Sequence, residues 1–255
     1  MAFGSEHGAP LLRYPIALLV TTTWRWARRD PRKAIMTSVA ENKALGTRAE
    51  EIASTAIQAV GTVLSVIGLV VIIDLAIPYG ALPVASVAVY GGTLVLAFFA
   101  STLYLGIRHV QAKRILRTID HCTIYLLIAG TYTPVVLLGL GGRSGWALMT
   151  AVWALALVGM VLRIAWPRQL LKLRIGLYLA LGWLIIAWAR PVFDGLGISG
   201  IGFLVSGGLA YSLGVIFYLW HSLPFNRAVW HLFVVTGSVC FFAAIAFYIL
   251  PTHAV

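Results

Sequence analysis

The sequence predicts an all-α integral membrane protein, built as a bundle of seven transmembrane helices. Three observations favour this class. Of the 255 residues, 60% are hydrophobic and only 11% are charged, whereas soluble domains contain about 25% charged residues. The apolar residues form runs of the length that a helix needs to cross a bilayer, about 20 residues. The basic residues are divided very unevenly between the connections.

The apolar runs place seven spans in order along the chain, at residues 54–77, 84–107, 120–140, 144–164, 175–190, 199–220 and 228–250. The fifth run is the shortest, and it closes at Arg190 and Pro191, a cation followed by a residue without a backbone N–H. The connections are short. We therefore expect one seven-helix domain at residues 50–255, preceded by a basic segment at residues 1–49.

The net charge of +11 reflects basic residues gathered on one side of these spans. Eight precede the first span, four lie in each of the second-to-third and fourth-to-fifth connections, and Arg227 precedes the last span; the other side has only Arg143 and Arg190 of the 19. Cytoplasmic loops carry the excess of Lys and Arg, so we expect a cytoplasmic N-terminus and an external C-terminus. The expected partners are membrane lipids, and nucleic acid is not expected.

Residues 10–24 form a short apolar run that is interrupted by Arg13 and Pro15 and followed by an arginine-rich stretch. A signal peptide carries its positive charges before the run, so this segment does not fit one. Two interpretations remain open, a helix lying in the membrane interface and a tail without fixed structure. If the run crossed the membrane, the count would rise to eight.

Ionisable residues at membrane depth are costly and mark candidate functional sites. Four such positions occur in the spans, Asp74, Asp120, His121 and His231. Asp74 lies near the outer end of the first span, where it can reach the headgroup layer. His121 follows Asp120 and is expected to point about 100° away from it around the helix.

Topology brings Ser101, Asp120, Arg227 and His231 to a similar depth on the cytoplasmic side. Ser101 lies in the last turns of the second span, and Asp120 opens the third. Arg227 and His231 are four residues apart at the start of the seventh span, so they share one helix face. These four residues form a candidate polar cluster. The alternative is that each one caps or snorkels at its own helix end.

Six segments carry a resemblance to a known family, in order and at matching spacing. They are residues 50–73, STLYL at 101–105, AKRILRTIDHCTIYLLIAGTYTP at 112–134, GWALMTAVW at 145–153, LYLALGWLII at 177–186 and RAVWHLFVVTGS at 227–238. They resemble the bacterial hemolysin III family, which belongs to the wider group of progestin and adiponectin receptors. The resemblance implies a multi-pass protein of the bacterial plasma (inner) membrane with seven helices and a cytoplasmic N-terminus.

The resemblance also implies a zinc site in those members that bind metal. Three histidines hold the ion near the cytoplasmic face, one ending an S-x-x-x-H motif in the second span and two in an H-x-x-x-H motif in the seventh. An aspartate contacts the site through water. Ser101, Asp120 and His231 match this pattern, whereas Leu105 and Arg227 stand at the other two histidine positions. Three further positions depart from the family's usual residues: Ser54, Gln58 and Phe241.

These departures argue against a zinc cofactor. A catalytic zinc takes three protein ligands, but Leu105 has no lone pair and Arg227 adds a fixed positive charge. Zinc would bind only if the site were rebuilt with other histidines, namely His109, His121 or His221. We expect instead that Arg227 pairs with Asp120, so that a side chain replaces the metal between the helices.

Three functions stay open at this stage. The favoured one is a membrane protein without zinc catalysis, for which the resemblance suggests lipid sensing or membrane homeostasis. The second is a zinc-dependent hydrolase of lipid amides or esters, in which zinc would activate water and Asp120 would assist as base. The third is a pore-forming hemolysin, although a toxin that inserts itself needs more polar surface than this composition provides.

Overall fold

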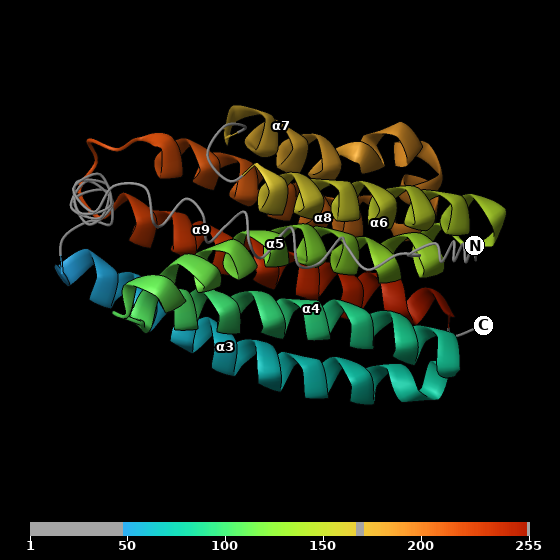
Figure 1. The fold of residues 1–255 in the computed structure, drawn as a ribbon. Coiled ribbons are helices and arrows are strands. Elements are labelled where there is room, and N and C mark those ends of the chain that lie inside the picture. Colours follow the sequence, from blue (N-terminus) through green and yellow to red (C-terminus); the bar gives the residue numbers. More distant parts are fainter. Residues whose placement is uncertain (1–47, 167–170, 254–255) are drawn as a thin grey trace, which may run out of the picture. The chain divides into compact units, whose positions relative to one another are not determined.

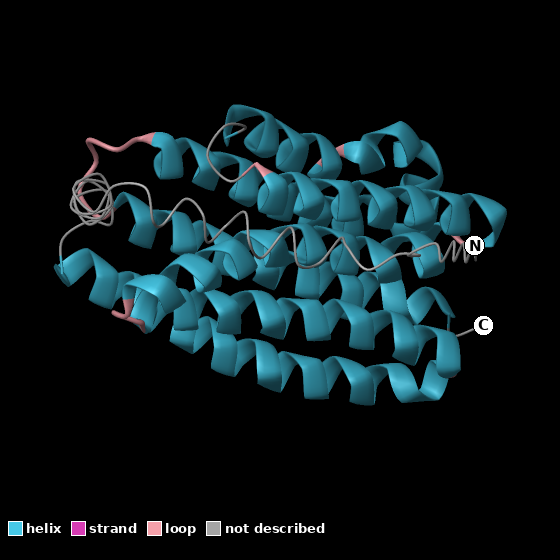
Figure 2. Cartoon of the chain, in the orientation of Figure 1, coloured by secondary structure: helices cyan, strands magenta, loops and turns pink. Residues whose placement is uncertain are grey.

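The computed structural model of the chain describes residues 48–166 and 171–253 (Figure 1). The chain divides into two units, residues 1–47 and 48–255. The first unit, with the apolar run at residues 10–24, lies outside the described residues. Within the described ranges, helices are joined by short connections and no strand occurs, as the sequence predicts (Figure 2).

Seven α-helices run through residues 48–166 and 171–253. They are α3 (Arg48–Ala76), α4 (Ala81–Gly106), α5 (Val110–Pro134), α6 (Gly142–Ala165), α7 (Leu171–Gly182), α8 (Ala189–Leu219) and α9 (Asn226–Ala244). Short 3₁₀ or π segments extend or join them: η1 (Ile77–Tyr79), η2 (Val135–Leu140), η3 (Leu184–Trp188), η4 (Ile245–Ile249) and η5 (Leu250–His253). Six of the described helices are long and apolar enough to cross a membrane, and the fifth predicted span corresponds to a shorter apolar helix, Leu173–Ile186.

The third helix begins earlier than its apolar run does. The sequence predicts a start at residue 120, whereas α5 starts at Val110. Lys and Arg, which occur three times in the intervening residues, are good helix formers. The His109 side chain caps the helix by accepting from the Ala112 N–H at 3.4 Å. The prediction that Asp120 opens this helix is therefore wrong. Asp120 lies about three turns inside α5.

α5 is the most enclosed of the spanning helices that the structure describes. It packs against α4 on one side and α6 on the other (Figure 1). In its most apolar stretch 72% of the residues are buried, against at most 39% in the other five spanning helices. Polar residues in the later part of α5, among them Thr123, Thr131 and Thr133, are consequently buried, whereas α3 and α8 carry many exposed apolar side chains.

The hydroxyl group of Tyr132 bridges the break in the fifth predicted span. α7 ends at Gly182, and the chain continues in the 3₁₀ turn η3. The Tyr132 hydroxyl of α5 donates to the Gly182 carbonyl oxygen at 3.1 Å and accepts from the Ile185 N–H at 2.8 Å. Where a helix breaks at membrane depth, backbone N–H and C=O groups lose their helical hydrogen-bond partners and need others. Tyr132 supplies these partners at the break after Gly182.

Replacing Tyr132 with phenylalanine is expected to lower the free energy of unfolding by about 1–2 kcal/mol, because two buried backbone groups lose their partner. Thermal unfolding of the detergent-solubilised protein measures the change. Tyr248→Phe is the matched control, since among the described residues its hydroxyl makes no hydrogen bond. Equal stability of the two variants would contradict the bridging role.

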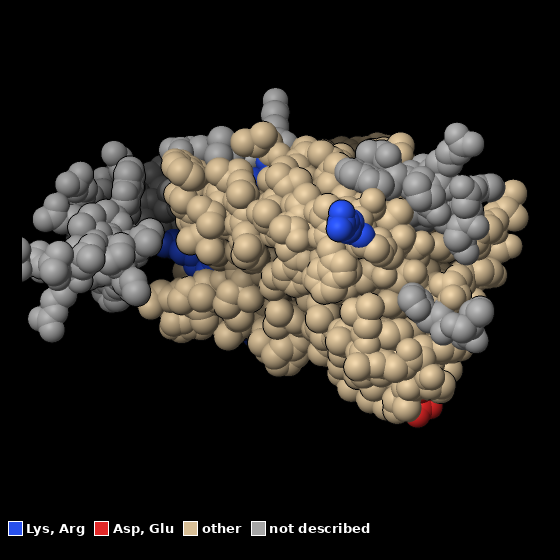
Figure 3. All heavy atoms as spheres, turned by 90° about the vertical axis from the view of Figure 1, so that its right-hand side faces the viewer, with Lys and Arg blue, Asp and Glu red and all other residues tan. Residues whose placement is uncertain are grey.

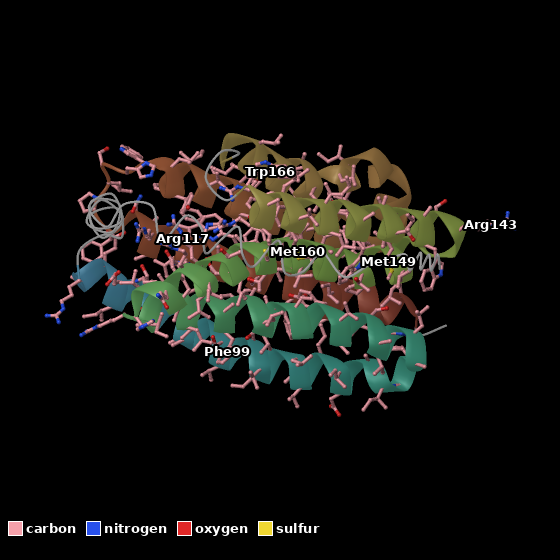
Figure 4. The ribbon with its side chains drawn as sticks, viewed as in Figure 1. Phe99, Arg117, Arg143, Met149, Met160 and Trp166 are labelled. Carbon is pink, nitrogen blue, oxygen red and sulfur yellow. The ribbon has the colours of Figure 1, made fainter. Side chains whose placement is uncertain are left out.

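Charged side chains gather at one end of the described bundle. α3, α5, α7 and α9 begin at this end, and α4, α6 and α8 finish there. The described basic residues of this end are Arg48, Arg108, Lys113, Arg114, Arg117, Arg163, Arg174 and Arg227. Arg143 marks the opposite end (Figure 4), and the visible part of that face carries few charged groups (Figure 3). The predicted separation of charge is thus present, and the assignment of the charged end to the cytoplasm stays a prediction.

Candidate functional site

Ser101 and Asp120 form the first pair of the predicted cluster. α4 and α5 pack against each other, which brings the last turns of α4 beside the early turns of α5. The Ser101 hydroxyl donates a hydrogen bond to a carboxylate oxygen of Asp120. Ser101 is buried, and only 13% of the Asp120 side chain is exposed. The sequence placed the two residues at a similar depth, and the structure adds the hydrogen bond between them.

His231 forms the second pair, with a residue from α3. Its Nδ1 lies 2.5 Å from Nε2 of Gln58, and both side chains are buried. An amide NH₂ donates, so Gln58 donates in this arrangement and the imidazole nitrogen accepts. Ser54 Oγ, one turn earlier on α3, and Gln58 Oε1 are buried without a hydrogen-bond partner among the described residues.

Arg227 lies in the first turn of α9 and contacts the start of α3. Its backbone N–H donates to Oε1 of Glu50 at 3.3 Å, and Glu50 is buried. The cations whose charge acts on Asp120 include Arg117 and Arg163. The pairing of Asp120 with the Arg227 side chain, which the sequence suggests, stays a prediction.

His121 lies closer to Asp120 than its helix position suggests. Its Nδ1 is 3.6 Å from Oδ2 of Asp120 and 2.6 Å from the carbonyl oxygen of Arg117. The ring folds back over the preceding turn, as long side chains on helices do, and this direction offsets the rotation between neighbouring residues. The two side chains therefore approach each other although their positions on α5 differ by about 100° around the helix.

The other positions that the sequence analysis considered for zinc ligands are Leu105, His109 and His221, and they do not add to the cluster. Leu105, in the last turns of α4, is buried with 5% exposure. His109 caps α5 and is exposed, as is His221 in the connection before α9. Among the described residues, no three His, Cys, Asp or Glu side chains group closely enough to hold a metal ion. The described groups are the His231 imidazole with the Gln58 amide and the Asp120 carboxylate with the Ser101 hydroxyl and the His121 imidazole, and they do not form a three-histidine zinc site.

Two site residues escaped the sequence analysis altogether, Arg163 and Arg174. Both were counted as connection charges, yet each is only 5% exposed. Arg163 Nη2 donates to the Arg117 carbonyl oxygen at 3.4 Å. One sequence feature did indicate that Arg163 is buried, namely its place inside the fourth predicted span, residues 144–164. No such feature indicated the burial of Arg174.

Comparison with known proteins places these features in a family. The sequence profile described as Haemolysin-III related matches residues 47–242. Hemolysin-3 of Bacillus cereus is 42% identical over 204 residues, which cover 80% of this chain and 93% of that protein. The Hemolysin-3 homolog of Bacillus subtilis (strain 168) is 42% identical over 200 residues, covering 78% and 94%. The human Monocyte to macrophage differentiation factor is 30% identical over 167 residues, covering 62% and 67%.

The profile begins at the start of α3 and extends into α9, so it covers the helices that carry both pairs of the polar cluster. The helical composition and the six long apolar helices agree with a protein that crosses the membrane several times. The chain is a multi-pass membrane protein that belongs to the haemolysin III family.

Proposed function

We propose that this protein works without zinc catalysis, in lipid sensing or homeostasis of the bacterial plasma membrane, with its charged end in the cytoplasm. The observation that carries this proposal is the hydrogen bond between Gln58 and His231. It joins α3 to α9 at the level where the family resemblance implies a metal. In this interpretation, neutral hydrogen bonds replace zinc as the link between helices.

The chemistry of the neighbouring side chains supports this interpretation. A zinc hydrolase needs an activated water held by the metal, and three ligands to hold the metal. Leu105 contributes a buried apolar side chain at one of the implied ligand positions. Asp120, the carboxylate that would assist such a reaction, is hydrogen-bonded to Ser101. The polar cluster thus has the features of a structural connection between helices.

Metal content tests the proposal, with a variant that restores the histidine set. The protein purified from zinc-supplemented cells is expected to hold no tightly bound zinc, whereas Leu105→His/Arg227→His is expected to bind about one zinc ion per chain. Elemental analysis by mass spectrometry measures both. Adding His231→Ala to the double variant is the matched control, and it should abolish the zinc binding.

One zinc ion held tightly by the unaltered protein would overturn the proposal and favour a lipid hydrolase. The name of the Bacillus cereus relative, Hemolysin-3, points to lysis. Release of dye from liposomes on addition of this protein would likewise overturn the proposal and favour pore formation.

A further inference from the structure

Two buried arginines lie where α6 ends and α7 begins. Arg163 belongs to the last turn of α6, just before Trp166, which Figure 4 labels. Arg174 belongs to the first turn of α7. Each is 5% exposed. α7 packs against both α5 and α6, so the two guanidinium groups, which are permanent cations, are enclosed by helices.

Most of the buried donors of these arginines are unpartnered. Arg163 Nε and Nη1 and Arg174 Nη1 are buried and have no hydrogen-bond partner among the described residues. Buried polar groups are hydrogen-bonded in the great majority of cases, and burial of a cation is costly unless an opposite charge compensates it. The three nitrogens therefore indicate a missing acceptor.

The Tyr125 side chain of α5 lies beside these two arginines. Its hydroxyl is buried and makes no hydrogen bond of regular geometry in the described part of the chain, and its nearest polar neighbour is the Tyr178 hydroxyl. Its ring lies against that of Tyr178, with centroids 4.3 Å apart. The charges of Arg163 and Arg174 both act on Tyr125, so the phenol and the two guanidinium groups belong to one cluster.

The described charges around this cluster are unbalanced. Arg163 experiences the like charges of Arg174 and Arg117. Asp120 experiences the charges of Arg117 and Arg163, and it also accepts from Ser101. The Asp120 carboxylate thus acts on Arg117 and Arg163, and Arg174 adds a further cation beside Arg163. The acceptor that the unpartnered donors require should therefore be an anion.

We propose that Arg163, Arg174 and Tyr125 form a binding site for a phosphate group at the charged end of the bundle. The planar fork of donors on arginine matches the geometry of phosphate oxygens. The phosphate comes either from the headgroup of an anionic phospholipid or from soluble inorganic phosphate. None of the three residues stands at a position where the resemblance implies a zinc ligand, so this site is independent of the proposed function.

Thermal unfolding of the full chain tests the site with two probes. The first is phosphatidylglycerol, added to phosphatidylcholine nanodiscs that hold the protein. The second is inorganic phosphate at millimolar concentration, compared with chloride at equal ionic strength. At least one probe is expected to raise the Tm. Arg163→Gln is expected to weaken that binding about tenfold or more, because a charge-assisted hydrogen bond is lost.

Arg114→Gln is the matched control, because Arg114 is an exposed cation at the same end of the bundle. It should leave the response to either probe unchanged. Arg174→Gln provides a second variant if Arg163→Gln fails to fold. A response to phosphatidylglycerol alone identifies the lipid headgroup as the source, and a response to phosphate alone identifies the free anion. No response to either probe, or an equal loss in Arg114→Gln, would overturn the site.

Discussion

Replacing Asp120 with alanine is expected to lower the free energy of unfolding by about 3–5 kcal/mol, because removal of one partner leaves buried cations uncompensated. The carboxylate accepts from Ser101 and experiences the charges of Arg117 and Arg163. Without it, the Ser101 hydroxyl loses its acceptor and the guanidinium groups face one another. Thermal and SDS-induced unfolding of the solubilised protein measure the loss.

Asp74→Ala is the matched control, because it removes an exposed carboxylate from α3. Its stability should stay within about 0.5 kcal/mol of the unaltered protein, as expected for a surface position. Asp120→Asn, which keeps an acceptor but loses the charge, should lie between the two. If Asp120→Ala were as stable as Asp74→Ala, the electrostatic role of Asp120 would be refuted.

The same measurement identifies the cation that stabilises Asp120. Double-mutant cycles compare the coupling of Asp120→Ala with Arg163→Met and with Arg227→Met. A large coupling with Arg227 would support the pair suggested by the sequence. A large coupling with Arg163 would favour the charges found around α5 and α6.

Replacing Gly159 with valine is the second change with a large expected effect, a loss of about 3 kcal/mol from overpacking. Gly159 of α6 lies against the ring of Tyr125, so closely that a Cβ atom would overlap three of its ring carbons. Tyr125 is fully buried and packs on Tyr178, which leaves its ring little room to move. Thermal unfolding measures the loss.

The control for this change is Gly202→Val in α8. A Cβ at Gly202 meets no atom of the described residues within 4 Å, so the variant should be as stable as the unaltered protein. A similar result for Gly159→Val would show that the Tyr125 ring shifts at little cost and that α5 and α6 are not closely fixed at this point.

The helices and their order along the chain were readable from the sequence, whereas the rotation of each helix was not. Apolar length placed the spans, and their alternation put Ser101 and Asp120 at a similar depth, where the structure has a hydrogen bond. The partner of His231 is Gln58 of α3, and that pairing depends on how α3 and α9 turn toward each other. Such rotation is set by packing with neighbouring helices, for which a single sequence holds little signal.

Arginines near helix ends were misread for a related reason. A basic residue beside an apolar run usually snorkels to the membrane surface, so Arg163 and Arg174 were counted as connection charges. In the structure both turn into the bundle. The early start of α5 shows the opposite error, since its charged first turns continue the helix beyond the apolar run.

The break in the fifth crossing has a consequence for the lipid around it. α7 ends at Gly182, and the chain continues through η3 and the first residues of α8 to Gly197, where the backbone leaves the helical conformation. The crossing thus consists of two helical pieces joined at a turn. A transmembrane segment adjusts to bilayer thickness by tilting or kinking, so the two pieces should change their angle at Gly182 when the protein is moved between bilayers of different thickness.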